Sequence, residues 1–290
     1  MLRDNPVEIL NFLQENKDDY YLNLRGSSSI CQYDLIKWHE FGKKDLYSGK
    51  PQSVKLWKKE NGHIVCDWGH IELFSNIGQP AMHIETYTCD IQDVIGLSAS
   101  KSNLSSYDCM HKMAQKGSPE MVDEISLEKL KLNLRWPEIR IINQTNTSDN
   151  FVYHAWDKRL FLSNSGGSHH FASARYIANQ LKIDVPLEGK LIIHSIAKEP
   201  LSELVQHYAM FAVTLELGKE YSLVKHLVNF NVASAIIELP RGAKLNSACI
   251  LFPRKGIREQ KVLEIFEELG FFDLGTHLLN LATEQYFLKE

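Results

Sequence analysis

The chain has 290 residues, of which 44% are hydrophobic and 23% are charged, the proportions of an ordinary folded globular protein. Its 32 basic and 36 acidic side chains give a formal charge of −4, which excludes attachment to nucleic acid or to a membrane surface by bulk positive charge. We therefore expect no membrane partner and no nucleic-acid partner, and the length favours one large domain or two of ordinary size.

The first half is predicted to begin with a helix and to continue as a series of strands. Ile9, Leu10 and Leu13 fall at helical spacing after Pro6, and proline is favoured at the first position of a helix. Between residues 20 and 87, short segments rich in β-branched and aromatic residues are separated by turn residues. These segments are 55–58, 62–68 and 82–87, and Asn61-Gly62 after the first of them indicates a β-hairpin.

The middle of the chain supplies the predicted domain boundary. Residues 97–117 are polar and rich in serine, which is typical of an irregular connection, and residues 119–134 are predicted to form a helix. Its expected inward residues are Met121, Val122, Ile125 and Leu132. Trp136 ends this helix because the residue before a proline is disfavoured in the helical conformation. We therefore divide the chain into a strand-rich domain, 1–135, and a second domain, 136–290.

The second half alternates between strand-like and helix-like segments, which indicates an α/β domain. The predicted strands are 139–142, 159–162, 190–194, 234–238 and 248–252. The predicted helices are 170–181, 200–213, 223–230 and 258–269. The apolar residues of 274–288 recur at helical spacing and fit the core better than an oligomer interface, the alternative. The chain as a whole is predicted to be α+β, with a strand-rich N-terminal half followed by an α/β C-terminal domain.

The compartment is expected to be the cytoplasm. The N-terminal residues show no basic region followed by an apolar one, and no apolar run approaches the length of a membrane span. The five cysteines are odd in number, widely spread and without a CxxC pair. This pattern favours reduced thiols over a disulfide framework.

One segment, residues 159–178, has the features of a phosphate-binding turn. A strand is followed by Gly166 and Gly167 and then by a helix that begins with Ser168, His169 and His170. Consecutive glycines let the backbone approach a ligand closely, and the free N–H groups of a first helical turn favour an anion such as phosphate. The hydroxyl of Ser168 and the two imidazoles add hydrogen-bonding groups, and Arg175 lies further along the same helix.

This segment, Gly166-Gly167-Ser168-His169-His170-Phe171-Ala172-Ser173-Ala174, resembles the nucleotide-phosphate motif of the ParB/sulfiredoxin superfamily. In sulfiredoxins the motif reads Gly-Gly-Cys-His-Arg-Tyr and precedes an alanine-bearing helix. The resemblance covers about twenty residues and implies that the turn cups the phosphates of a nucleotide such as ATP or CTP. If the bound nucleotide reacts, Mg²⁺ is expected with it. The candidate ligand-binding residues are those of this turn, Gly166, Gly167, Ser168, His169 and His170, together with Arg175 from the same helix.

The departures from that motif limit what the resemblance implies. Ser168 stands where sulfiredoxins have their cysteine, so sulfinic-acid reduction is not expected, and His170 replaces the usual arginine with a pH-dependent group. The DNA-reading helices of a chromosome-partition protein are not recognisable. A purely structural interpretation stays open as well, since Gly-Gly between a strand and a helix also forms a tight turn in which Ser168 caps the helix.

Other patterns are weaker. His63, Cys66, Asp67 and His70 lie close in sequence, but a strand would place them on opposite faces, so no metal site is predicted. No complete catalytic motif is present, which leaves any enzymatic activity open. Four acids could orient a catalytic group or bind Mg²⁺, and no spacing selects one of them: Asp149, Asp157, Asp184 and Glu199.

Two functional hypotheses follow. In the first, the second domain binds a nucleotide or another phosphorylated ligand at Gly166–His170, and any chemistry is phosphoryl transfer or hydrolysis. In the second, the chain is a non-enzymatic interaction protein that works through a protein partner or as a homo-oligomer. In its overall appearance, and without a shared motif, the sequence resembles proteins of phages and other mobile elements. These include anti-defence proteins that inhibit host complexes such as Gabija.

Overall fold

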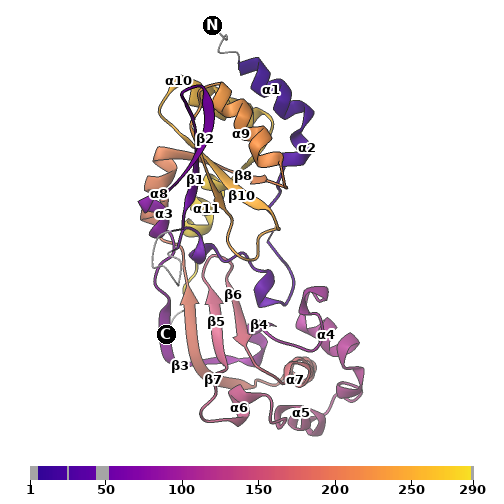
Figure 1. The fold of residues 1–290 in the computed structure, drawn as a ribbon. Helices are drawn as coiled ribbons and strands as arrows, with labels where there is room; N and C mark the ends of the chain where they lie inside the picture. The colour runs from indigo at the N-terminus through magenta and orange to yellow at the C-terminus, as the bar shows by residue number, and fades with distance from the viewer. Residues whose placement is uncertain (1–5, 25, 44–51, 289–290) are drawn as a thin grey trace. The chain divides into compact units, whose positions relative to one another are not determined.

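The computed structural model describes residues 6–24, 26–43 and 52–288, in two compact units that are each discontinuous along the chain (Figure 1). The first unit contains the described residues of 1–25, 37–79 and 196–284. The second contains those of 26–36, 80–195 and 285–290. The predicted boundary near residue 135 therefore falls inside the second unit. Strand pairing explains the difference, because strands from both halves of the sequence enter each sheet.

The first unit is built around an antiparallel sheet of six strands in the order β11-β8-β10-β9-β1-β2. Its strands are β1 (Val54–Glu60), β2 (His63–Gly69), β8 (Tyr208–Thr214), β9 (Ser234–Glu238), β10 (Ser247–Pro253) and β11 (Phe272–Asp273). Asn61 and Gly62 both have positive φ, 49° and 84°, which is the geometry of a two-residue hairpin turn. The hairpin predicted from Asn61-Gly62 is thus confirmed.

Helices cover both faces of this sheet. Ile9 and Leu13 of α1, Val224 of α9 and Phe266 of α10 pack on one face, and α8 and α11 contact β8 on the other. Leu274 and Leu278 of α11 are completely buried, so these residues belong to the core. The helices of this unit are α1 (Pro6–Glu15), α2 (Lys17–Tyr20), η2 (Trp38–Glu40), α3 (Glu72–Ser75), α8 (Lys198–His207), α9 (Lys219–Asn229), α10 (Ile257–Glu268) and α11 (Leu274–Thr283).

The predicted helix 200–213 is wrong in its second half. Helix α8 ends at His207, and the following residues form β8, which hydrogen-bonds with β10 on one side and β11 on the other. Ala209 through Val213 are all buried. A continuous apolar run is what a strand covered on both faces requires, and over this length it does not distinguish strand from helix.

The second unit is built around a mixed sheet of five strands in the order β3-β7-β5-β6-β4. The β7–β5 and β6–β4 pairs are parallel, and the β3–β7 and β5–β6 pairs are antiparallel. The strands are β3 (Met82–Asp90), β4 (Val94–Leu97), β5 (Asn150–His154), β6 (Arg159–Ser163) and β7 (Pro186–His194). With the helices of both units, these sheets confirm the predicted α+β class and the predicted strands of the N-terminal half, which are β1, β2 and β3.

Helix α7 packs on this sheet through small residues. Ala172, Ala174 and Ala178 are completely buried among the apolar side chains of the second unit, and α4 and α5 pack against α7 in turn. The helices of this unit are η1 (Gln32–Asp34), η3 (Ile91–Asp93), η4 (Leu104–Ser106), α4 (Met110–Gly117), η5 (Pro119–Met121), α5 (Leu127–Leu134), α6 (Arg140–Asn143) and α7 (Ser168–Leu181).

Three predictions for the middle of the chain are wrong in part. Residues 97–117, expected to be an irregular connection, contain η4 and α4. The helix expected at 119–134 is broken into η5 and α5, because Ser126 accepts a hydrogen bond from the Lys129 N–H and starts a new helix. Ile125 and Leu132, expected inward, are exposed. The strand expected at 139–142 is the short helix α6. The Asn143 side-chain amide donates to three main-chain carbonyls at the end of α5 and in the connection to α6, those of Leu134, Trp136 and Ile139.

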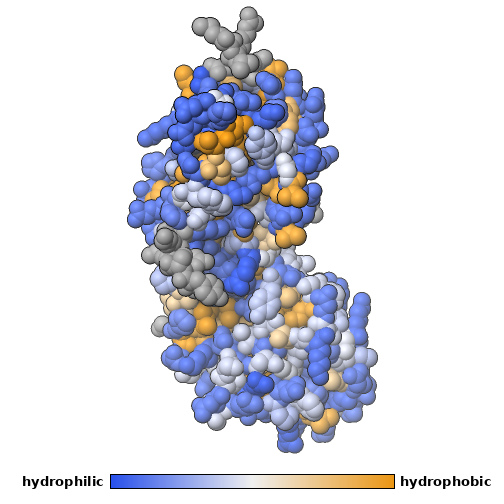
Figure 2. Space-filling view, viewed as in Figure 1, coloured by the Kyte–Doolittle hydropathy of each residue, from blue (hydrophilic) through white to orange (hydrophobic). Residues whose placement is uncertain are grey.

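Hydrophilic side chains cover most of each unit on the face shown in Figure 2, with apolar side chains in small groups between them. Among the described helices, none has the length and apolar character needed to cross a membrane.

Candidate functional site

The predicted strand–turn–helix segment is present, and its second glycine is required by the fold itself. Strand β6 ends at Ser163 and helix α7 begins at Ser168. Gly167, the residue before the helix, has φ of 68°, a conformation that side chains other than glycine rarely adopt. A Cβ at this position would lie 2.7 Å from main-chain atoms of Glu138 and Ile139. The turn is therefore closely packed whether or not a ligand binds.

The main-chain N–H groups at the start of α7 are its most distinctive feature. The first hydrogen bond of the helix runs from the Phe171 N–H to the Gly167 carbonyl, at 2.9 Å. Among the described residues, the five consecutive N–H groups of Gly166 through His170 have no hydrogen-bond acceptor. No acidic residue occupies the first turn. The positive end of the α7 dipole favours an anion, and the Glu138 carboxylate already lies beside it, with Oε2 3.5 Å from the position of a Cβ on Gly166.

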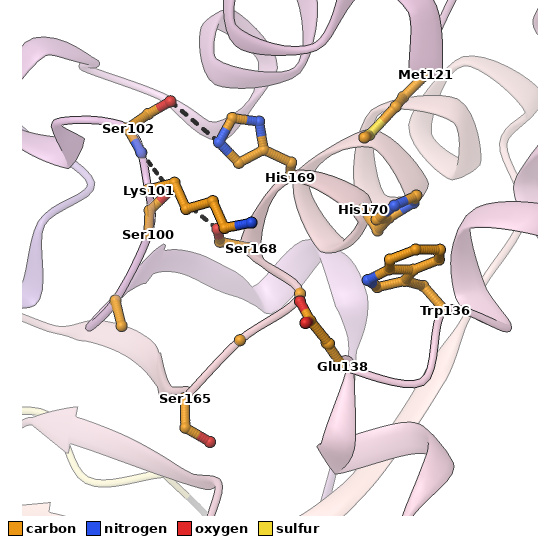
Figure 3. Close-up of a pocket in the computed structure, with 13 residues that line it drawn as sticks. Ser100, Lys101, Ser102, Met121, Trp136, Glu138, Ser165, Ser168, His169 and His170 are labelled. Atoms are coloured by element: carbon orange, nitrogen blue, oxygen red, sulfur yellow. Dashed lines mark hydrogen bonds between the residues drawn. The ribbon is translucent and has the colours of Figure 1, made fainter.

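These N–H groups belong to residues that line one cavity of about 550 Å³ in the second unit (Figure 3). The other walls come from the loop after β4, from η5 and from the connection between α5 and α6. The lining residues are Ala99, Ser100, Lys101, Ser102, Met121, Trp136, Glu138, Ser165, Gly166, Gly167, Ser168, His169 and His170. Five of the six predicted ligand-binding residues thus share a cavity.

The buried side chain of Asn164 fixes the turn to the loop after β4. Its Oδ1 accepts hydrogen bonds from the N–H groups of Ser98 and Ala99, at 3.2 and 3.1 Å. Its Nδ2 donates to the carbonyls of Ala99 and Gly166, at 2.9 and 3.0 Å. With these four bonds a single side chain positions both the serine-rich wall and the glycine turn.

The side chains of Ser168 and His169 are already engaged. The Ser168 hydroxyl donates to Ser100 at 2.9 Å and makes no capping bond, so the predicted capping role is wrong: Gly167 occupies that position. The two ring nitrogens of His169 hydrogen-bond with the hydroxyls of Ser102 and Ser118. These side chains hold the walls of the cavity together, while their main-chain N–H groups lack acceptors.

His170 and Trp136 form an aromatic wall. Their rings are stacked, with centroids 4.2 Å apart and an interplanar angle of 19°. The Asn133 amide nitrogen donates to the carbonyls of Met121 and Lys129, so its Oδ1 is left to accept from His170 Nδ1, at 2.9 Å. Burial, and secondarily the neighbouring His169, lower the pKa of His170 from its ordinary value of 6.5. Neutral His170 with a proton on Nδ1 presents Nε2 as a hydrogen-bond acceptor.

The cavity carries one cation and one anion among its described lining residues. Lys101 is exposed, and its side chain extends toward the start of α7 (Figure 3). It makes no ion pair with any described residue. Glu138 lies beside the turn, its main chain packed against Gly167. The charge available to a ligand therefore consists of the helix dipole, the Lys101 ammonium and the Glu138 carboxylate.

Arg175, predicted to share this site, does not line the cavity. It faces a different part of the second unit, where its guanidinium donates to the Gln92 carbonyl at 2.8 Å. Arg175 lies seven residues after Ser168, about 10 Å further along the helix axis, so it is beyond the phosphate-like turn. Of the six predicted ligand-binding residues, Arg175 is thus the one that the structure does not bring to this cavity.

Sequence reasoning missed Lys101, Trp136 and Asn164. Lys101 and Trp136 lie outside the recognisable segment, in loops whose place beside α7 depends on the pairing of β4 with β6 and on the packing of α5 against α7. Asn164 lies within the segment, but its partners Ser98 and Ala99 come from the loop after β4. Trp136 gave a signal only as the end of a helix, and Asn164 only as a polar residue after a strand. Their roles come from long-range contacts.

The candidate metal and catalytic residues do not form a further centre. Among the described residues, no group of three His, Cys, Asp or Glu side chains is placed to hold a metal ion. Asp149 accepts hydrogen bonds from the Ser165 main chain and hydroxyl, and Asp157 pairs with Arg159. Asp184 and Glu199 do not line the cavity.

Comparison with known proteins places the chain in a family. The model of DUF6685, a family of unknown function, matches residues 84–290, and the chain belongs to this family. The match spans all of α7 and every residue that lines the cavity. No curated protein and no solved structure matches the chain. The resemblances to the ParB/sulfiredoxin superfamily and to phage anti-defence proteins stay predictions.

Proposed function

We propose that this member of the DUF6685 family binds a nucleotide or another phosphorylated small molecule in the cavity at the N-terminus of α7. The observation that carries the proposal is the run of five main-chain N–H groups, Gly166 through His170, that have no acceptor among the described residues and belong to residues lining one cavity. Such a run at a helix N-terminus is suited to phosphate oxygens. Lys101 adds a cation at the same place.

The rest of the cavity suits the non-phosphate part of such a ligand. Trp136, stacked on His170, and Met121 provide an aromatic and apolar wall against which a planar ring can lie. Neutral His170 accepts a hydrogen bond from a ligand hydroxyl or amine through Nε2 instead of binding phosphate by charge. The volume of about 550 Å³ falls within the range of small-molecule sites, roughly 300–1,000 Å³.

The geometry changes which groups should contact the phosphate. The side chains of Ser168 and His169 are occupied by serine hydroxyls, so these residues contribute through their main-chain N–H groups. Glu138, an acid beside the turn, suits a ribose hydroxyl or a Mg²⁺ ion that accompanies a nucleotide. The proposal is for binding, and turnover is a separate question. Ser102 and His169, whose hydroxyl and Nε2 are hydrogen-bonded at 3.0 Å, both line the cavity.

Isothermal titration calorimetry tests the proposal with inorganic phosphate, ADP, ATP, CTP and GTP, each with and without Mg²⁺. Lys101→Gln is expected to weaken binding of every phosphorylated compound by about tenfold, the lower range for a charge-assisted hydrogen bond. Lys131→Gln is the matched control, because Lys131 is an exposed lysine of the same unit outside the cavity. Trp136→Ala is expected to weaken the binding of nucleotides and to leave the binding of inorganic phosphate unchanged.

Two results would contradict the proposal. One is the absence of binding by every phosphorylated compound at millimolar concentration. The other is an equal effect of Lys101→Gln and Lys131→Gln, which would show that general charge, not the cavity, attracts the anion. The second hypothesis, an interaction protein that inhibits a host defence complex, stays a prediction, and no observation on the described residues favours it.

A further inference from the structure

A second cavity of about 550 Å³ lies in the same unit and shares no lining residue with the first. It is formed by the serine-rich segment before η1, the start of α4, the β5–β6 turn and the outer part of α7. Its lining residues are Gly26, Ser27, Ser28, Ser29, Ile95, Asp108, Cys109, Met110, Asp157, Arg159 and Arg175.

The two acids in this cavity already have cations. Asp157 pairs with Arg159, which also donates from Nη1 to the Ser29 carbonyl at 3.2 Å. Asp108 pairs with Lys112. These four charged groups form two ion pairs, and among the described lining residues Arg175 is left as the cation that makes none.

Arg175 uses little of its hydrogen-bonding capacity. Its guanidinium makes one hydrogen bond to the described residues, from Nη2 to the Gln92 carbonyl. Its Nε is buried and has no acceptor. Burial lowers the pKa of Arg175 from its ordinary value, but an arginine stays charged at neutral pH. No described carboxylate forms an ion pair with Arg175, although Asp90 and Asp93 lie near enough to favour its charged form. A bound anion would offset the desolvation cost that remains.

We infer that this second cavity binds a small oxyanion, such as phosphate, sulfate or a carboxylate group, through Arg175. The planar guanidinium offers two parallel N–H donors, which match a pair of oxyanion oxygens. The Ser28 hydroxyl lines the same cavity and makes no hydrogen bond with the described residues, so it provides a further donor. This site is independent of the one proposed at the start of α7.

Cys109 gives a local readout of occupancy. Its thiol is exposed and the residue lines the second cavity, whereas Cys66 is an exposed thiol on β2 of the first unit. Alkylation by iodoacetamide, an uncharged reagent, can be followed at both cysteines in the same sample by peptide mass spectrometry. Sodium phosphate, sulfate and acetate are added in separate series, with ionic strength held constant by sodium chloride.

Each effective oxyanion is expected to slow alkylation of Cys109 severalfold and to leave Cys66 unchanged. Arg175→Gln is expected to raise the concentration needed for half-maximal protection by about tenfold or more, the loss typical of a charge-assisted hydrogen bond. Arg175→Lys keeps the charge without the planar fork, so it should also weaken protection, and it serves as the second variant if Arg175→Gln does not fold. Which of the three anions protects best identifies the preferred oxyanion.

Lys101→Gln separates this inference from the proposed function. That variant removes the cation of the first cavity and should leave the protection of Cys109 unchanged. Cys109 alkylation that is unaffected by all three anions would overturn the inference. So would protection of the same strength in wild type and in both folded Arg175 variants, or parallel protection of Cys66, which would indicate a general salt effect.

Discussion

Asn164→Ala is expected to lower the free energy of unfolding of the second unit by about 2–4 kcal/mol. The side chain is 6% exposed and makes four hydrogen bonds to main-chain groups of Ser98, Ala99 and Gly166. At about 0.5–1.5 kcal/mol for each bond, their removal costs about 2–6 kcal/mol. Ala99 and Gly166 line the cavity, so water can hydrogen-bond to some of the main-chain groups that the substitution leaves without a partner. We therefore expect a loss in the lower half of that range.

Asn164→Asp tests separately the two hydrogen bonds that Nδ2 donates. One carboxylate oxygen keeps the bonds from the Ser98 and Ala99 N–H groups, but the other replaces Nδ2 opposite the carbonyls of Ala99 and Gly166. The carbonyl oxygens of Ala99 and Gly166 then both face a carboxylate oxygen, and none of these three atoms has a hydrogen to donate. Protonation converts that oxygen into a donor, so this variant should be less stable at pH 7 than at pH 4 when each is compared with wild type at the same pH.

The assay must report on the second unit alone. Native-state hydrogen exchange of the Phe151, Phe161 and Leu162 amides, in the central strands β5 and β6, gives the free energy of opening of this unit in each variant. A loss smaller than about 1 kcal/mol in Asn164→Ala would refute the reasoning, because it would mean that the four bonds are replaced by water at no net cost.

Two further predictions concern backbone strain and pH. Gly167→Ala should cost more stability than Gly270→Ala: the two glycines have nearly the same φ, 68° and 69°, but a Cβ at Gly270 meets nothing within 4 Å, whereas one at Gly167 meets the Glu138 main chain at 2.7 Å. The strain from positive φ alone costs about 1–3 kcal/mol in each variant. If urea unfolding gave the same loss of unfolding free energy for both, the close contact with the Glu138 main chain would be ruled out as a cause. Separately, burial lowers the pKa of His111, His170, His226 and His277 from 6.5. Their protons bind more tightly to the unfolded chain, so stability should fall as pH decreases below about 6.5 toward the folded-state values. Denaturation midpoints at pH 7.5 and 5.5 should show this decrease, and His277→Gln should reduce it; a midpoint independent of pH over this interval would contradict the assignment.

Local patterns predicted elements whose cause lies within a few residues. Asn61-Gly62 fixes the β1–β2 hairpin because both residues tolerate positive φ. The two glycines before Ser168, followed by the alanines of α7, predict a strand, a tight turn and a helix packed on a sheet, and the structure contains all three. The N–H groups at the start of α7 were predictable for the same reason, since every helix leaves its first turn without internal acceptors.

Tertiary structure decided what lies around that turn. Strand β4 pairs in parallel with β6, and this brings Lys101 and the Ser98–Ser102 loop to the start of α7. The packing of α5 against α7 brings Trp136 onto His170. Long-range pairing also made Tyr208–Thr214 a strand and distributed both halves of the chain over both units. Short sequence windows do not contain this information, because backbone hydrogen bonds and apolar burial are satisfied by partners more than a hundred residues away, as in the pairing of β1 with β9. The sequence by itself therefore determined that a glycine turn with free N–H groups precedes α7, and the fold determined which side chains share its cavity.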